Sequence, residues 1–217
     1  MIHARKCGCL ILCLITCALG GCQVGGALAG KLLPPERIKP KYVGFMGQSV
    51  GVMVWTDRGV QIDYPTLNLD LANSVQSKLM TAGSSEELKG AVFPVQPASI
   101  ARYQLDHPSI NMKNVAEVAP RLGVTRLIYL EVGDFGTRAP ASVELYRGSM
   151  TATMKIVEVT AGAGTLAYNE NNIKVAFPPH VPEDGTPDGD DIRFYAGTID
   201  AMSTEILNRL VSYEAPE

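Results

Sequence analysis

The sequence contains no cysteine beyond residue 22, and all five of its cysteines lie at Cys7, Cys9, Cys13, Cys17 and Cys22. A disulfide framework would distribute cysteines over the domain that it stabilises, so this arrangement excludes one. A zinc site is also disfavoured, because the spacings lack C-x-x-C and the run from residue 7 to residue 21 is apolar. The folded part of the chain must therefore be stabilised by a hydrophobic core.

Other absences exclude further classes of protein. The chain carries 19 basic and 22 acidic residues, a formal net charge of −3, and it lacks the basic patch of a nucleic-acid-binding protein. After residue 21 no apolar run is long enough for a transmembrane helix. No Rossmann or Walker glycine pattern follows a predicted strand, and no cofactor is expected.

The cysteine-rich N-terminus is typical of a processing signal. Arg5 and Lys6 form a basic n-region. Residues 7–19 form an apolar segment that is too short to span a bilayer well as a permanent helix. The sequence Leu19-Gly20-Gly21-Cys22 follows and resembles the bacterial lipobox. An ordinary secretory signal with a chance cysteine is the alternative. The resemblance implies that residues 1–21 are a signal peptide and that Cys22 is the lipidation site.

An acylated Cys22 would join the mature protein to a lipid bilayer. The resemblance implies a diacylglycerol on the thiol. Acyl chains such as palmitate contribute about 0.8 kcal/mol per buried CH₂ to the free energy of membrane binding. Gln23, in place of an aspartate after the cysteine, favours the outer membrane by resemblance to other lipoproteins. The expected location is therefore the bacterial cell envelope, on the periplasmic side of the outer membrane.

Residues 22–41 are predicted to be a flexible tether, because glycines and prolines repeatedly interrupt regular structure there. Residues 42–217 are predicted to form one α/β domain. Hydrophobic periodicity gives, in order, strand 49–55, helix 67–79, strand 91–95, short helices 97–104 and 114–122, strand 125–135, strands 148–159 and 165–177, and helix 192–210. Two polar segments, 133–147 and 178–191, are expected to be mobile.

This order predicts the architecture. The first half requires parallel, right-handed crossovers, and the second half is an antiparallel meander. The fold class is therefore α/β (α+β), with a mixed sheet of about five strands and helices packed on it. Pro120 is expected to shorten or kink its helix, because proline costs about 3 kcal/mol in a helix interior. The final helix should bury a stripe of residues, namely Ile192, Tyr195, Ile199, Met202, Ile206 and Leu210.

The stretches "RYQLDHP", "LGVTRLIYLEV", "YRG" and "MKIVEVTAGAGTLAY", after a lipobox and an apolar first strand, carry a family resemblance. Their order resembles that of bacterial envelope lipoproteins whose domain is similar to the TolB amino-terminal domain and to CsgG-like lipoproteins. The resemblance covers roughly residues 45–213. It implies a β-α-β core used for assembly or docking, without shared catalytic residues.

Ser49 lies in Gly47-Gln-Ser-Val-Gly51, which matches the hydrolase motif G-x-S-x-G. In hydrolases the motif follows a strand, whereas here it enters one, and only His107 and His180 remain as candidate bases after loss of the signal. A glycine-rich strand entry is the favoured interpretation. No catalytic residue is therefore predicted, and the protein is not expected to be an enzyme.

Two further groups are candidate binding sites. An acidic loop could offer calcium its oxygens, but it lacks the EF-hand order, and a solvated loop is favoured; its members are Glu183, Asp184, Asp188, Asp190 and Asp191. The segment Arg102–Pro108 is either a surface recognition patch or a capped helix end with Tyr103 packed. No metal site is predicted.

The expected function is that of a lipid-anchored, non-catalytic docking or assembly subunit of a cell-envelope complex. Its partners would be the bilayer, through Cys22, and envelope proteins, with no nucleic acid. The alternative is a lipoprotein that binds a small ligand, a lipid or a glycan, in a pocket between helices and sheet. A serine hydrolase using Ser49 is a third hypothesis.

Overall fold

The structure is a computed structural model that describes residues 37–140, 142–180 and 182–214. The predicted signal peptide, the predicted lipidation site Cys22 and most of the predicted tether lie outside the described residues. A compact unit spans Lys39–Tyr213, and the fold described below is that of this unit.

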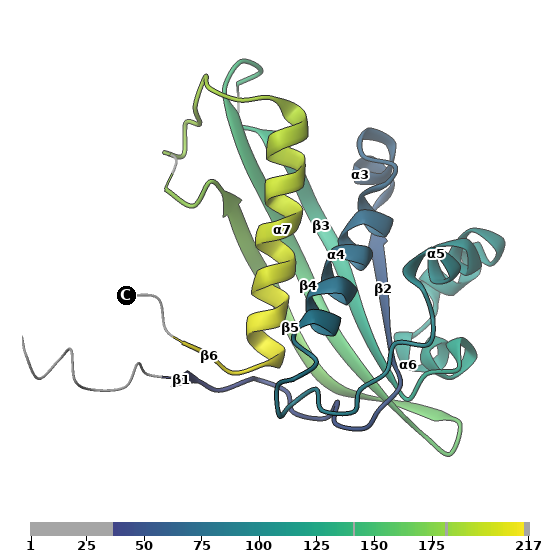
Figure 1. Ribbon diagram of the computed structural model, residues 1–217. Helices are drawn as coiled ribbons and strands as arrows, with labels where there is room; N and C mark the ends of the chain where they lie inside the picture. The colour runs from purple at the N-terminus through teal and green to yellow at the C-terminus, as the bar shows by residue number, and fades with distance from the viewer. Residues whose placement is uncertain (1–36, 141, 181, 215–217) are drawn as a thin grey trace, which may run out of the picture. The chain divides into compact units, whose positions relative to one another are not determined.

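The unit is built on one mixed sheet of four strands (Figure 1). The strands lie in the order β2 (Val50–Thr56), β3 (Arg126–Arg138), β4 (Tyr146–Thr160) and β5 (Ala163–Phe177). The first pair is parallel and the other two pairs are antiparallel, which confirms the predicted crossover and meander. The two-residue strands β1 (Arg37–Ile38) and β6 (Tyr213–Glu214) lie outside this sheet.

The expected strand at residues 91–95 is not part of the sheet. It is reduced to an isolated parallel bridge between Ser49 and Val92. Pro94 has no N–H to donate to a ladder, which accounts for the early end of this pairing. The four-stranded sheet therefore has one strand fewer than the sequence led us to expect.

Two long helices cover one face of the sheet. Figure 1 shows α4 (Leu67–Thr81) and α7 (Asp191–Leu210) side by side across it. Their apolar stripes and the alternate residues of the strands form the larger core. Its fully buried members include Val52, Ile128, Met154 and Ile156 from the strands and Leu71, Leu79, Met202 and Ile206 from the helices.

The N-terminal turn of α7 differs from its expected stripe. The Asp190 carboxylate accepts a hydrogen bond from the Arg193 N–H at 2.8 Å and so caps the helix. Ile192, expected in the buried stripe, is 81% exposed, whereas Phe194 is fully buried. The apolar contact of this helix with the sheet therefore begins two residues later than the periodicity indicates.

Short helical segments cover part of the second face. They are α5 (Pro97–Asp106), η1 (Pro108–Met112), α6 (Val115–Val118) and η2 (Ala119–Leu122). The effect expected of Pro120 is confirmed, since the α-helix ends at Val118 and the chain continues as a 3₁₀ turn that ends at Gly123 (φ 70°). These segments and the sheet form a smaller core around Met53, Leu127 and Val157.

The two segments expected to be mobile are partly integrated into the fold. β3 extends to Arg138 and β4 begins at Tyr146, so the expectation for residues 133–147 was wrong for most of the segment. In the other segment Thr186 exchanges two backbone hydrogen bonds with Tyr146, at 2.8 and 3.0 Å. A helix that the sequence did not reveal, α3 (Arg58–Asp63), begins at Asp57, whose carboxylate accepts from the Val60 N–H.

Candidate functional site

The second face of the sheet is only partly covered. β4 and β5 are 15 residues long, whereas the segments packed on this face are short. Polar or half-buried side chains line the uncovered part of this face, which we call the open face. They are Trp55, Glu131, Thr151, Thr153, Lys155 and Asn169. Side chains alternate along β4, and Ala152, Met154 and Ile156 point to the opposite, helix-covered side.

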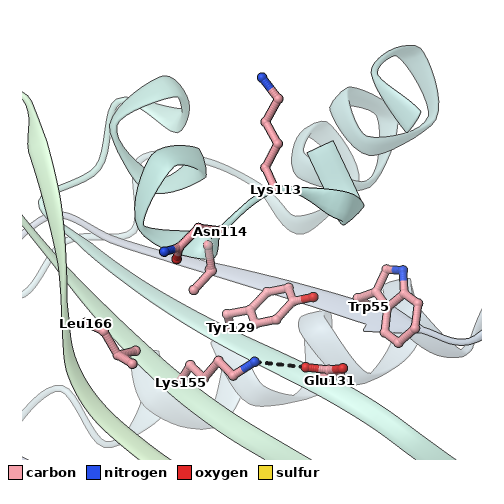
Figure 2. Close-up of a pocket in the computed structure, with 8 residues that line it drawn as sticks. Trp55, Lys113, Asn114, Tyr129, Glu131, Lys155 and Leu166 are labelled. Atoms are coloured by element: carbon pink, nitrogen blue, oxygen red, sulfur yellow. Dashed lines mark hydrogen bonds and ion pairs between the residues drawn. The ribbon is translucent and has the colours of Figure 1, made fainter. Parts of the chain in front are cut away.

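A pocket of about 330 Å³ lies where the open face meets the segment before α6 (Figure 2). We call it the Trp55 pocket; it is lined by Trp55, Lys113, Asn114, Val115, Tyr129, Glu131, Lys155 and Leu166. Strand pairing brings these side chains together, because Trp55 lies opposite Glu131 and Tyr129 lies opposite Lys155. No local pattern in the sequence indicates this pocket.

An ion pair fixes part of the pocket wall. The Lys155 ammonium lies 3.0 Å from a carboxylate oxygen of Glu131, as Figure 2 shows. The same ammonium is 5.7 Å from the centroid of the Tyr129 ring. Both contacts hold the lysine side chain along the sheet rather than in solvent.

Tyr129 provides a hydrogen-bond donor in the same pocket. Its side chain is only 7% exposed, and Figure 2 shows its hydroxyl end directed toward Trp55. Burial raises the pKa of the phenol above its usual value, and the negative charge of Glu131 raises it further, so the hydroxyl keeps its proton. Within the described ranges, no hydrogen bond to this hydroxyl is present.

Ser49, the residue of the hydrolase-like motif, lies directly before β2, as predicted. Its hydroxyl donates to the Thr125 hydroxyl at 3.2 Å and accepts from the Thr125 N–H at 2.9 Å. His107 stacks on Tyr103, with ring centroids 4.3 Å apart, and its Nδ1 lies 3.1 Å from the Tyr103 carbonyl oxygen. The hydroxyl proton of Ser49 is therefore directed to a threonine, not to a base.

The acidic loop is divided among separate structural roles. Asp190 caps α7, while Asp191 accepts hydrogen bonds from both Arg138 (2.6 and 3.0 Å) and Thr137 (2.7 Å). These bonds hold the pKa of Asp191 below its usual range. In the described part of the chain, no three His, Cys, Asp or Glu side chains are grouped closely enough to hold a metal ion.

The segment Arg102–Pro108 forms the end of α5. The Tyr103 ring is half-buried against the smaller core and contacts His107, as expected of a packed and capped helix end. The Gln104 amide, which is buried, donates to the Val54 carbonyl at 3.2 Å and so ties the helix to β2. These contacts favour a structural role for the segment.

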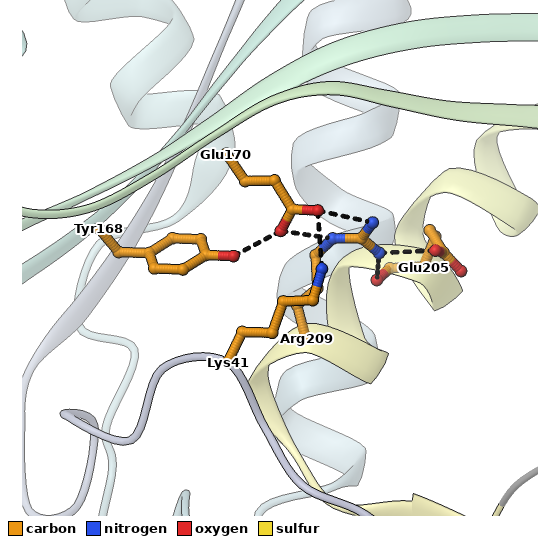
Figure 3. Close-up of polar contacts among 5 residues, drawn as sticks. All are labelled: Lys41, Tyr168, Glu170, Glu205 and Arg209. Carbon is orange, nitrogen blue, oxygen red and sulfur yellow. Dashed lines mark hydrogen bonds and ion pairs between the residues drawn. The ribbon is translucent and has the colours of Figure 1, made fainter.

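A second polar cluster lies on the helix-covered side of the sheet (Figure 3). Glu170 of β5 accepts hydrogen bonds from Lys41 (2.9 Å), from Arg209 of α7 (3.0 and 3.1 Å) and from the Tyr168 hydroxyl. Arg209 also binds Glu205 at 2.6 Å. Burial alone would raise the pKa of Glu170, but these donors outweigh it and lower the pKa to about 2. The cluster joins a strand, a helix and the segment before β2, and its donors are already satisfied within the fold.

Comparisons with known proteins give only distant matches. No family model matches the chain, and no curated protein matches it. Lipoprotein GNA1162 from Neisseria meningitidis is 12% identical, with a TM-score of 0.44 over 74% of this chain and 96% of that one. The PelC dodecamer from Paraburkholderia phytofirmans is 9% identical, with a TM-score of 0.44 over 82% and 99%. The hypothetical protein CT253 from Chlamydia trachomatis is 11% identical, with a TM-score of 0.39 over 74% and 99%.

A lipoprotein is thus among the solved structures that this chain is similar to. No helix in residues 37–214, apart from the two undescribed positions, is both long and apolar enough to cross a bilayer.

Proposed function

We propose that this chain is a lipid-anchored, non-catalytic protein of the bacterial envelope that acts as a docking or assembly subunit, with the open face as its docking surface. The observation that supports this function is the uncovered part of the sheet. Parallel strands are normally buried on both faces, whereas antiparallel strands such as β4 and β5 can leave one face open. Here Thr151, Thr153 and Lys155 leave a polar, partly exposed surface on a rigid element.

The anchor is the second component of the proposal. The basic pair Arg5 and Lys6, the apolar segment 7–19 and the Leu-Gly-Gly-Cys sequence before Gln23 support acylation of Cys22 at the outer membrane, facing the periplasm. With acyl chains in the bilayer, the compact unit 39–213 would remain on the membrane surface, where an open face can meet envelope proteins.

Site-specific photo-crosslinking in intact cells tests the docking surface. A photoreactive residue at Thr153, in the middle of the open face, should give one or more discrete products of higher mass. The matched control is Ala196, which is exposed on α7 over the other side of the sheet and should give none of these products. Equal products from both positions, or none from Thr153, would contradict the proposal.

Binding of a small ligand is a second candidate function, and the Trp55 pocket favours it. Its volume lies at the lower end of the range of about 300–1,000 Å³ that is common for ligand sites. Three of its eight lining residues are charged, so a polar ligand such as a glycan fits the lining better than a lipid tail.

A further inference from the structure

We propose that the Trp55 pocket binds an acidic sugar, with the ring against Trp55 and the carboxylate near Lys113. This inference rests on the second candidate function, ligand binding in that pocket. The ligand class follows from the aromatic ring, the hydrogen-bond donor and acceptor, and the charged groups that converge in this pocket.

The aromatic component is Trp55. Its side chain is half-buried at the end of β2, and Figure 2 shows it at one side of the pocket with the Tyr129 hydroxyl directed toward it. A large planar side chain offers apolar contact area at a low cost in conformational entropy. One face of a sugar ring consists largely of C–H groups, so it can pack on such a plane while its hydroxyls reach the polar side chains nearby.

The hydrogen-bonding groups are complementary to sugar hydroxyls, which both donate and accept. Tyr129 is more than nine-tenths buried, keeps its proton and has no partner for its hydroxyl among the described residues. The hydroxyl is not among the fully buried polar atoms that lack a partner, so it is accessible from the pocket and can donate to a ligand oxygen. Glu131 supplies carboxylate oxygens that can accept from a second hydroxyl, because its ion pair with Lys155 uses only part of its capacity.

The charge of the pocket selects an acid. Two lysines and one glutamate line it, and Lys155 is already paired with Glu131. Lys113 is exposed, and no ion pair of its ammonium is present in the part of the chain that the structure describes. The surplus positive charge would attract a carboxylate, although the whole chain has a net charge of −3.

Intrinsic fluorescence can report on this pocket directly, because Trp55 is the only tryptophan in the sequence. The full chain is purified in a detergent without a sugar headgroup and titrated with trigalacturonate. A saturable change in Trp55 emission is expected. The matched probe is the methyl ester of trigalacturonate, which keeps the rings and linkages but lacks the charge, and it should bind about tenfold more weakly.

Two variants locate the ligand groups. Lys113→Gln should weaken binding of the acid about two- to fivefold and leave binding of the ester unchanged. Tyr129→Phe removes no hydrogen bond among the described residues and should weaken both probes about five- to tenfold. No saturable emission change with trigalacturonate, or equal affinity for acid and ester, would overturn the proposal. Crosslinking at Thr153 does not depend on this result, so failure here is distinguishable from failure of the docking proposal.

Discussion

Ser49 and Thr125, which are 76 positions apart in the sequence, are joined by a reciprocal set of hydrogen bonds. The Ser49 N–H donates to the Thr125 hydroxyl at 2.9 Å, and that hydroxyl donates in turn to the Ser49 carbonyl at 3.1 Å. The Thr125 N–H donates to both the Ser49 hydroxyl and the Ser49 carbonyl. The pair fixes the point at which the parallel strands β2 and β3 begin.

Ser49→Ala is expected to lower the free energy of unfolding by only about 1 kcal/mol, because the Thr125 N–H retains the Ser49 carbonyl as its acceptor. Thr125→Val should cost more, about 1–3 kcal/mol, since it leaves the Ser49 N–H without its acceptor. Thr125→Ser is the control that keeps the hydroxyl. Urea unfolding measures the free energy of unfolding of all three variants.

Loss of a hydrolytic activity in a fully folded Ser49→Ala protein would overturn the proposal that the chain is not an enzyme.

The Glu170 cluster should make stability depend on pH. The folded-state pKa of Glu170 is about 2, below its usual value of 4.5, so its stabilising effect is fully present above pH 4.5 and is lost as the pH falls toward 2. Glu170→Gln should therefore destabilise the protein at pH 7 by about 1 kcal/mol, after allowance for solvent screening. The difference from the wild type should shrink at pH 3.

Urea unfolding at pH 7 and pH 3 checks this dependence. Glu144→Gln, at an exposed loop position, is the control and should leave the pH dependence unchanged. The opposite trend, a larger difference between wild type and Glu170→Gln at pH 3, would contradict the role assigned to the cluster.

The sequence predicted the elements of the fold better than their edges. Apolar runs and alternation located β2, the hairpin of β4 and β5, and the core of α7. They misjudged Ile192, because a helical stripe does not show where the sheet beneath it ends. They also missed α3, for which the capping pattern at Asp57 was the available signal.

Local sequence patterns do not predict the Trp55 pocket. Its main residues come from three strands, and only the parallel register of Trp55 with Glu131 and the antiparallel register of Tyr129 with Lys155 bring them together. The alternation of apolar and polar residues along β4 puts Lys155 on the polar face, but it carries no information on the neighbouring strand. Register between distant strands depends on the packing of the whole sheet.

Gly164 marks a close approach between β5 and α6. A Cβ atom at this position would lie 2.0 Å from the carbonyl oxygen of Ala116, so any side chain must displace the backbone of α6. Gly164→Ala should therefore cost about 1–3 kcal/mol. Gly133→Ala is the matched control in β3, because apart from its chain neighbours no atom of the described residues lies within 4 Å of the added Cβ, and its effect should stay within about 0.5 kcal/mol. Thermal unfolding followed by circular dichroism compares them, and equal losses would refute the close packing.

Ile206 and Ile192 give a second matched pair, on one helix. Ile206 is fully buried between α7 and the sheet, whereas Ile192 is 81% exposed. Ile206→Asp would bury an unpaired charge and should cost about 3–5 kcal/mol, enough to unfold most of a marginally stable domain. Ile192→Asp should be tolerated, since it adds a favourable acid to the first turn of α7. Circular dichroism and solubility distinguish the two, and unfolding of both would mean that the first turn contributes to the core.

The proposed anchor depends on one thiol, Cys22. Cys22→Ala should abolish acylation, and a chain in which residues 1–21 are also replaced by a cleavable secretory signal should leave the membrane fraction after cell breakage. The replacement matters because an uncleaved apolar segment 7–19 could itself hold the chain in a bilayer. Cys17→Ala is the control, since that residue would be removed with the signal and the protein should remain acylated. Mass spectrometry of the N-terminal peptide reports the lipid, and fractionation in high salt reports the anchor. If the unlipidated chain stayed firmly bound to membranes in high salt, the attachment would have to come from the folded protein and not from Cys22.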